Sequence, residues 1–294
     1  MKTFRLDRAL SVGLAHPISH LLNGHSGLRV PILMYHGISS QIGSRHPYFE
    51  TNTSLELFAQ HMQFLRENDY ATVDLNEALE AIMTGRNGQK RVAITFDDGL
   101  RDLYTAAFPV LMQHGFKATM FIVSGFTGDQ PISREGREYL TWQEVREMHS
   151  HGIRIGSHTV NHPELYRLSP REVEFEIRQS KETIEDGLGE QIRSFSYPYA
   201  FPEHDKKFVE RLKDLLQTHG YEDGVTTILG TASHQHDWFF LPRLPVNTHD
   251  DLRFLQAKLE GDYDWLHAAQ KLYKTFIKRA MKRSASPKLT VGPR

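Results

Sequence analysis

The sequence predicts an α/β fold in which about seven parallel strands close into a distorted (β/α) barrel. Short apolar runs that are typical of buried strands recur along the chain, and helix signals lie between most of them. This alternation indicates a mainly parallel sheet, and about seven repeats favour closure over an open sheet. The length of 294 residues suits one barrel-sized domain better than two small ones.

The expected strands are short runs of aliphatic, β-branched and aromatic residues. In a parallel sheet, the carboxyl ends of the strands meet where the variable loops converge, and sites form there. The runs cover residues 30–35, 91–96, 118–123, 153–157, 194–197, 224–229 and 240–246.

Helix starts between these strands are marked by capping residues. Pro109 is expected in the first turn of a helix that closes at Gly115. Three other starts have a cap residue followed three positions later by Glu, which is the capping-box pattern. These pairs are Thr53 with Glu56, Thr141 with Glu144, and Ser169 with Glu172.

We expect three parts in the chain: an N-terminal extension (1–28), a catalytic barrel (29–250) and a C-terminal helical, basic tail (251–294). The stretch "ALSVGLAHPISHLL" is the nearest match to a signal peptide, but histidines and a proline interrupt it. Since no apolar run of about 18 residues occurs either, the expected location is cytoplasmic.

Composition restricts the chemistry. The net charge is −1, so the chain lacks the overall basic excess that is typical of nucleic-acid-binding proteins. The chain has no cysteine, so a metal site must use His, Asp or Glu.

The last 24 residues hold eight Lys or Arg and no Asp or Glu, whereas the rest of the chain holds 27 basic and 36 acidic residues. Apolar residues lie opposite the lysines at helical spacing. This pattern is typical of peripheral contact with an anionic membrane, although a solvated terminal helix explains it equally well.

Reactive side chains follow several of the predicted strands. His36 follows the run 30–35, Asp97 and Asp98 follow 91–96, and His158 follows 153–157. Adjacent carboxylates repel each other and are costly to bury, so a cation is the expected partner. A helix cap would explain one aspartate but not both.

His158 and His162 are four residues apart, so on one helical turn both rings would face the same side. Together with one carboxylate they would form a three-ligand metal site with an open position for water. A second carboxylate beside that water would act as general base.

Three segments in this order resemble the polysaccharide deacetylase family, the carbohydrate esterases with a nodulation-type chitooligosaccharide deacetylase domain. They are "TFDDG" (95–99), "HTVNHP" (158–163) and "YPYA" (197–200), and the resemblance extends from about residue 29 to 246. It implies a distorted barrel and hydrolysis of an acetamide.

The resemblance also implies roles for five residues. Asp97 would be the general base, and Asp98, His158 and His162 would bind one divalent metal. Tyr199 would offer its backbone N–H to the oxyanion. His and carboxylate ligands suit zinc, while cobalt, nickel, manganese and iron stay open.

Two departures from the family pattern stand out. The arginine that usually orients the catalytic aspartate falls on Ser196, and Arg243 is the expected substitute, with a surface ion pair as the alternative. The usual late histidine of the general acid is missing. The segment "PILMYHG" resembles the rearranged subgroup with an N-terminal Tyr-His strand, which makes His36 the candidate acid and His249 the reserve.

The predicted activity is removal of the N-acetyl group from an amino sugar in a glycan or a lipid-linked precursor. A deformylase, or another small-amide or imide hydrolase, would use the same groups. A catalytically silent carbohydrate-binding protein is the alternative from another class. Candidates for stacking on sugars are Tyr35, Tyr48, Tyr199 and Trp238.

Overall fold

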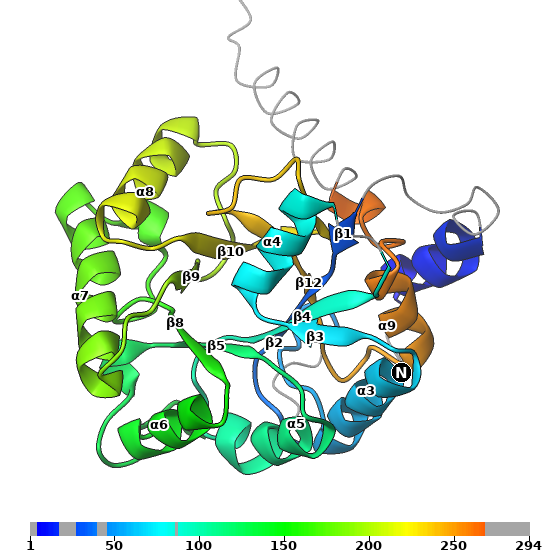
Figure 1. The fold of residues 1–294 in the computed structure, drawn as a ribbon. Helices are drawn as coiled ribbons and strands as arrows, with labels where there is room; N and C mark the ends of the chain where they lie inside the picture. Colours follow the sequence, from blue (N-terminus) through cyan, green and yellow to red (C-terminus); the bar gives the residue numbers. More distant parts are fainter. Residues whose placement is uncertain (1–4, 18–27, 40–45, 86–87, 268–294) are drawn as a thin grey trace, which may run out of the picture.

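Seven parallel strands form a closed ring in the computed structural model, which describes residues 5–17, 28–39, 46–85 and 88–267. The order around the ring is β2-β12-β10-β9-β8-β5-β4, and pairing of β2 with β4 closes it (Figure 1). The strand bounds are β2 (Ile32–Tyr35), β4 (Arg91–Phe96), β5 (Thr119–Ile122), β8 (Arg154–Ser157), β9 (Ser194–Ser196), β10 (Asp223–Leu229) and β12 (Leu241–Pro245). All seven lie within a residue or two of the predicted runs, which confirms the barrel.

The described residues contain five further short strands, which the sequence analysis missed. β3 (Ala71–Val73) pairs with the first half of one edge of β4, and β5 pairs with the second half of that edge. The others form two antiparallel pairs, β1 (Arg29–Val30) with β11 (Ala232–Ser233), and β6 (Ser133–Arg134) with β7 (Arg137–Glu138).

Most of the helices surround the strands in Figure 1, while α4 lies across one end of the ring. The buried side chains of α4 join an apolar cluster with Ile32, Ala93 and Leu241 inside the barrel. This end is therefore filled, which leaves the carboxyl ends of the strands for a site. The helix bounds are α3 (Leu55–Glu67), α4 (Leu75–Thr84), α5 (Phe108–His114), α6 (Trp142–Ser150), α7 (Pro170–Leu188), α8 (Lys206–Thr218) and α9 (Leu252–Leu259).

Capping decides where several helices begin. The capping boxes of α6 and α7 are present as predicted. The box expected at Thr53 is wrong, because Ser54 is the N-cap of α3 and accepts a bond from the Leu57 backbone N–H at 3.2 Å. Thr53 is instead buried, and its hydroxyl donates to the Val246 carbonyl at 3.5 Å.

Pro109 lies in the first turn of α5, as predicted, and α5 ends at Gly115 in the left-handed conformation. A π-helical turn, Leu103–Ala107, precedes α5 directly, so the helical backbone begins earlier than expected. A proline has no N–H to donate to the preceding turn, which agrees with a change of helix type just before it.

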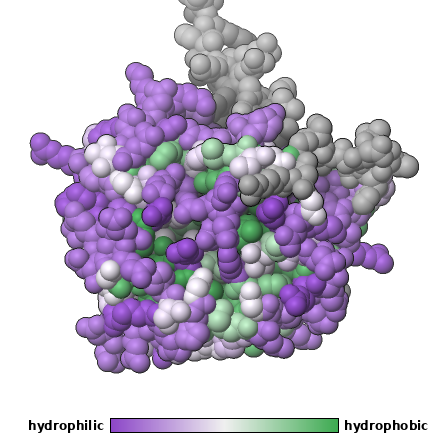
Figure 2. Space-filling view, in the orientation of Figure 1, coloured by the Kyte–Doolittle hydropathy of each residue, from purple (hydrophilic) through white to green (hydrophobic). Residues whose placement is uncertain are grey.

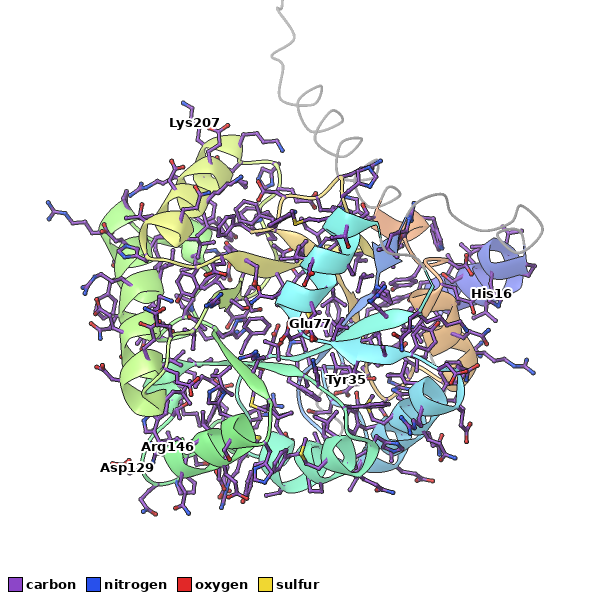
Figure 3. All side chains as sticks on the ribbon, in the orientation of Figure 1. His16, Tyr35, Glu77, Asp129, Arg146 and Lys207 are labelled. Atoms are coloured by element: carbon purple, nitrogen blue, oxygen red, sulfur yellow. The ribbon has the colours of Figure 1, made fainter. Side chains whose placement is uncertain are left out.

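The N-terminal segment packs against the region after β12. It comprises α1 (Leu6–Leu10) and a π-helical turn, Ser11–Ala15. Tyr263 donates to Asp7 at 3.0 Å, and Trp265 donates to Ser11 at 3.0 Å. His16 lies at the periphery (Figure 3), and the ring of Tyr35 packs between β2 and α3, where its hydroxyl bonds to His61 at 3.1 Å.

The face in Figure 2 is hydrophilic over the outer helices, with apolar residues in the hollows between them. Among the described residues, no helix has the length and hydropathy needed to cross a bilayer. The basic part of the tail lies outside the described residues.

Candidate active site

The predicted site residues gather at the carboxyl ends of the barrel strands. Asp97 directly follows β4, and its backbone N–H donates to the Tyr35 carbonyl at the end of β2, at 3.0 Å. Asp98 and Gly99 then adopt positive φ angles of 74° and 70°. This turn sends the two aspartate side chains in different directions, so each has its own set of partners.

Asp97 is buried and paired with Arg243 of β12. The two guanidinium Nη atoms donate to its two carboxylate oxygens at 2.8 and 2.6 Å. Ser196 of β9 donates to the same carboxylate at 3.2 Å. Burial alone would raise the pKa of the Asp97 carboxyl. The Arg243 guanidinium outweighs this effect and holds the pKa well below its usual range. Asp97 is therefore ionised at any working pH.

Arg243 is fixed in this position by other groups. It is fully buried, its Nε donates to the Thr226 carbonyl at 2.9 Å, and a terminal nitrogen donates to the Thr95 hydroxyl at 3.2 Å. The expected contact between Arg243 and Asp97 is thus present, and the alternative of a surface ion pair is wrong. Ser196, at the usual arginine position, bonds to both partners.

Asp98, His158 and His162 form a group that fits one metal ion. The Asp98 Oδ1 lies 3.6 Å from His158 Nε2 and 3.4 Å from His162 Nε2. His158 Nδ1–H donates to the Ser196 carbonyl at 2.8 Å. The lone pair on Nε2 is therefore available to bind a metal ion. Burial lowers the pKa of His162 to about 4, so its ring is neutral. Two imidazoles and one carboxylate are donors that suit a zinc-like divalent ion.

The two histidines are not on a helical turn, so that part of the sequence analysis is wrong. They lie on the loop after β8 (Figure 1), in which Thr159 and His162 have positive φ angles of 70° and 54°. The His162 backbone N–H donates to the Thr159 hydroxyl at 2.9 Å. This folded loop brings the ring centroids to 4.8 Å.

Glu176 of α7 holds this loop, and the sequence analysis missed it. One of its oxygens accepts bonds from the backbone N–H groups of Val160 and Asn161 at 2.8 and 2.9 Å. The other accepts the Asn161 side-chain amide at 2.8 Å. Glu176 is buried, so these bonds satisfy a carboxylate that would otherwise be costly. A glutamate among apolar residues at helical spacing was the only signal.

His36 lies near the aspartates, and His249 does not. Burial lowers the pKa of His36. The charges of Asp98 and Asp97 oppose this shift, so the His36 ring is close enough to both carboxylates to interact with them electrostatically. His249 is exposed on the loop after β12, and the contacts among the described residues include none between its ring and either aspartate.

Tyr199 presents its backbone to the site. Its φ is 58°, and its carbonyl accepts the Thr227 hydroxyl at 2.9 Å. Within the described part of the chain, its N–H has no acceptor. Its ring lies 4.6 Å from that of His162. The free N–H fits the expected oxyanion donor.

Backbone strain concentrates here. Of the six non-glycine residues with positive φ in the described ranges, four belong to the site, which are Asp98, Thr159, His162 and Tyr199. Such conformations cost about 1–3 kcal/mol each and persist where the surrounding structure imposes them.

A cavity of about 670 Å³ opens at this end and includes His36, Tyr48, Phe49 and Tyr199 in its wall. Tyr48 and Tyr199 therefore remain candidates for contact with a sugar. Tyr35 is buried in the core, and the carbonyl of Trp238 bonds to Gly224 near the amino end of β10, so the structure contradicts those two.

The chain is similar in sequence to known proteins of one family. A family model described as polysaccharide deacetylase matches residues 84–222. The protein YxkH of Bacillus subtilis (strain 168), whose name assigns it to the polysaccharide deacetylases, is 36% identical over 220 residues, which are 74% of this chain and 72% of YxkH. Poly-beta-1,6-N-acetyl-D-glucosamine N-deacetylase of Escherichia coli (strain K12) is 31% identical over 142 residues, which cover 44% of this chain and 20% of that protein.

Two solved structures are similar over most of the chain. The Streptococcus pyogenes deacetylase PplD in complex with acetate gives a TM-score of 0.68 at 26% identity and covers 80% of this chain and 99% of its own. IcaB from Ammonifex degensii gives 0.64 at 25% identity, with coverage of 80% and 98%.

Proposed function

This chain belongs to the polysaccharide deacetylase family, and on that premise we propose that it is a metal-dependent hydrolase that removes the N-acetyl group from an amino sugar. One observation carries the proposal. A buried, ionised carboxylate, Asp97, is oriented by Arg243 directly beside a group of two imidazoles and a second carboxylate. A pure sugar-binding protein has no use for a base next to a metal site.

Asp97 accepts the proton of the attacking water. Oδ1 of its carboxylate accepts bonds from both Arg243 and Ser196, whereas Oδ2 accepts only one bond from Arg243 and keeps a second lone pair for that proton. The same bonds prevent the carboxylate from turning away, so water is activated from one fixed direction.

Asp98, His158 and His162 would hold a divalent cation, of which zinc is our first expectation. Such a cation polarises the acetyl carbonyl and makes water more acidic. The Tyr199 backbone N–H is free to donate to the oxygen on which negative charge develops. A positioned donor of this kind contributes about 3–4 kcal/mol in other acyl-transfer enzymes.

His36 gives a proton to the departing amine. It follows β2 next to the aspartates and borders the cavity. His249 is exposed, so it fits the role of general acid less well than His36 does. A positioned acid contributes about 10²- to 10⁴-fold to the rate.

An N-acetylated glucosamine unit is the proposed substrate, in a glycan or on a lipid carrier. Support comes from relatives whose names specify N-deacetylation of poly-β-1,6-N-acetyl-D-glucosamine. A formamide or a cyclic imide would react by the same steps, so acetate release must be compared with formate release.

The first experiment is elemental analysis of purified protein, because it needs no assumed substrate. Wild type should hold about one equivalent of metal, and both Asp98→Asn and His162→Ala should lose it. Asp97→Asn is the matched control, since it should keep the metal and lose acetate release from N-acetylglucosamine oligomers. Wild type without metal after incubation with zinc would refute the mechanism.

A further inference from the structure

An apolar stripe runs along the outer face of the N-terminal segment. Leu6, Leu10 and Leu14 follow one another at intervals of four, and the side chains of Leu6 and Leu14 are 57% and 54% exposed. Asp7 and Ser11, at the same interval, face the barrel and are buried. The segment is therefore held by these polar residues and by Val12, which packs against the core, while Leu6 and Leu14 face outward, unlike the polar outer face of a typical surface helix.

Two aromatic side chains extend this stripe toward the active site. Phe49 is 74% exposed and Tyr48 is 46% exposed. Together with Leu6 and Leu10 they border a groove of about 540 Å³. We call Leu6, Leu10, Leu14, Tyr48 and Phe49 the leucine-aromatic patch.

The patch adjoins the catalytic cavity. Tyr48 and Phe49 border both the groove and the cavity that contains His36, and Leu229 and Pro245 also border both. Whatever covers the patch is thus at the mouth of the proposed site.

The charge of the chain indicates what covers it. The described residues end at His267, which borders the catalytic cavity, and the following 27 residues hold eight Lys or Arg and no acid. The rest of the chain has an excess of nine negative charges, so it would repel an anionic surface without this segment. Exposed leucines and aromatic rings, together with a cationic segment in the same chain, are the two components of binding to anionic lipid.

We propose that the leucine-aromatic patch docks on an anionic lipid bilayer, with the basic C-terminal segment supplying the electrostatic attraction. Docking places the catalytic cavity at the level of the lipid headgroups, and an amino sugar on a lipid carrier is then the substrate class. This last step rests on the proposed function, whereas docking itself does not.

Vesicle flotation with the full-length protein tests the proposal. Wild type should float with phosphatidylcholine vesicles that contain phosphatidylglycerol and stay behind with phosphatidylcholine alone. Leu6→Ser with Leu14→Ser, and separately Phe49→Ser, should reduce the floated fraction several-fold. Lys274→Gln with Lys278→Gln should weaken binding by roughly tenfold or more.

Met83→Ser with Phe175→Ser is the matched control, because these side chains are 63% and 45% exposed on α4 and α7, outside the patch. Unchanged flotation of this pair supports the proposal. Flotation that survives both patch variants overturns it, as does wild type that never floats. The proposal is also wrong if light scattering shows that a patch variant turns a dimer into a monomer without changing flotation, because the patch would then bind a second copy of the chain.

The measurement needs no turnover. A protein that floats but releases no acetate refutes the proposed function alone, and an active protein that never floats refutes the docking alone.

Discussion

Arg243 of β12 binds both oxygens of Asp97, which directly follows β4, at 2.8 and 2.6 Å. The two residues are 146 positions apart and lie on strands that are not neighbours, since β2 separates β12 from β4. The Asp97 carboxylate is therefore held by a side chain that reaches past the intervening strand β2.

Replacement of Arg243 by Lys should lower kcat strongly. Lysine keeps the charge but cannot make two parallel bonds, so Asp97 loses its fixed direction. We expect a fall in kcat of about 100-fold with little change in KM, measured by acetate release. Arg193→Lys is a control, because Arg193 forms an exposed ion pair with Glu222. Wild-type turnover in Arg243→Lys would contradict the positioning role.

His36→Ala should lower turnover by about 10²- to 10⁴-fold and leave the bound metal unchanged. The reason is loss of the proton donor for the amine, which is separate from metal binding. His249→Ala should retain turnover near that of wild type. The reverse pattern in these two variants would transfer the acid role to His249.

Glu176→Gln should weaken metal binding without removing a ligand. The single oxygen of Gln can still accept the backbone N–H groups of Val160 and Asn161, but its amide nitrogen cannot accept the Asn161 side-chain amide and the negative charge is lost, so the loop that carries His162 loosens. Loss of a residue that orients ligands typically costs about 10- to 100-fold in affinity. Zinc titration measures it, with the exposed Glu182→Gln as control. Equal affinities in the two variants would show that Glu176 is only structural.

Asp223→Asn should stabilise the protein at neutral pH. Asp223 is fully buried, neither of its oxygens has a hydrogen-bond partner within the described part of the chain, and burial raises its pKa to about 7 from 3.8. The folded state therefore holds the proton more tightly than the unfolded state. The stability that this proton provides is complete below about pH 4 and is lost as the pH rises through 7.

At pH 8 the ionised carboxylate costs up to about 4 kcal/mol, which Asn avoids. Thermal unfolding of both proteins between pH 5 and pH 8 should give a Tm difference in favour of Asn that grows with pH. A difference that does not change with pH would mean that Asp223 does not titrate in this range.

The parts of the structure that depend on local sequence pattern could be predicted from the sequence alone. The seven barrel strands are apolar because they are buried on both faces, and strand-end residues such as Asp97 and His158 then fall at one end. The three-residue strand β3 lacks enough pattern to be recognised.

Other features depend on contacts that no local pattern encodes. Thr53 and Ser54 are both suitable caps, and only the bond of Thr53 to Val246 decides between them. The left-handed backbone at Thr159 and His162 cannot be read from their spacing. Glu176 acquires its role from a loop 15 residues earlier in the chain.

The position of β12 in the ring has a consequence for biosynthesis. Its strand is the last of the seven to leave the ribosome, and it carries the guanidinium that neutralises the buried Asp97. A nascent or truncated chain without it has both an open ring and an uncompensated charge in its interior, which is strongly unfavourable. Closure of the ring and neutralisation of Asp97 are thus a single event, and a chain that stops before β12 achieves neither.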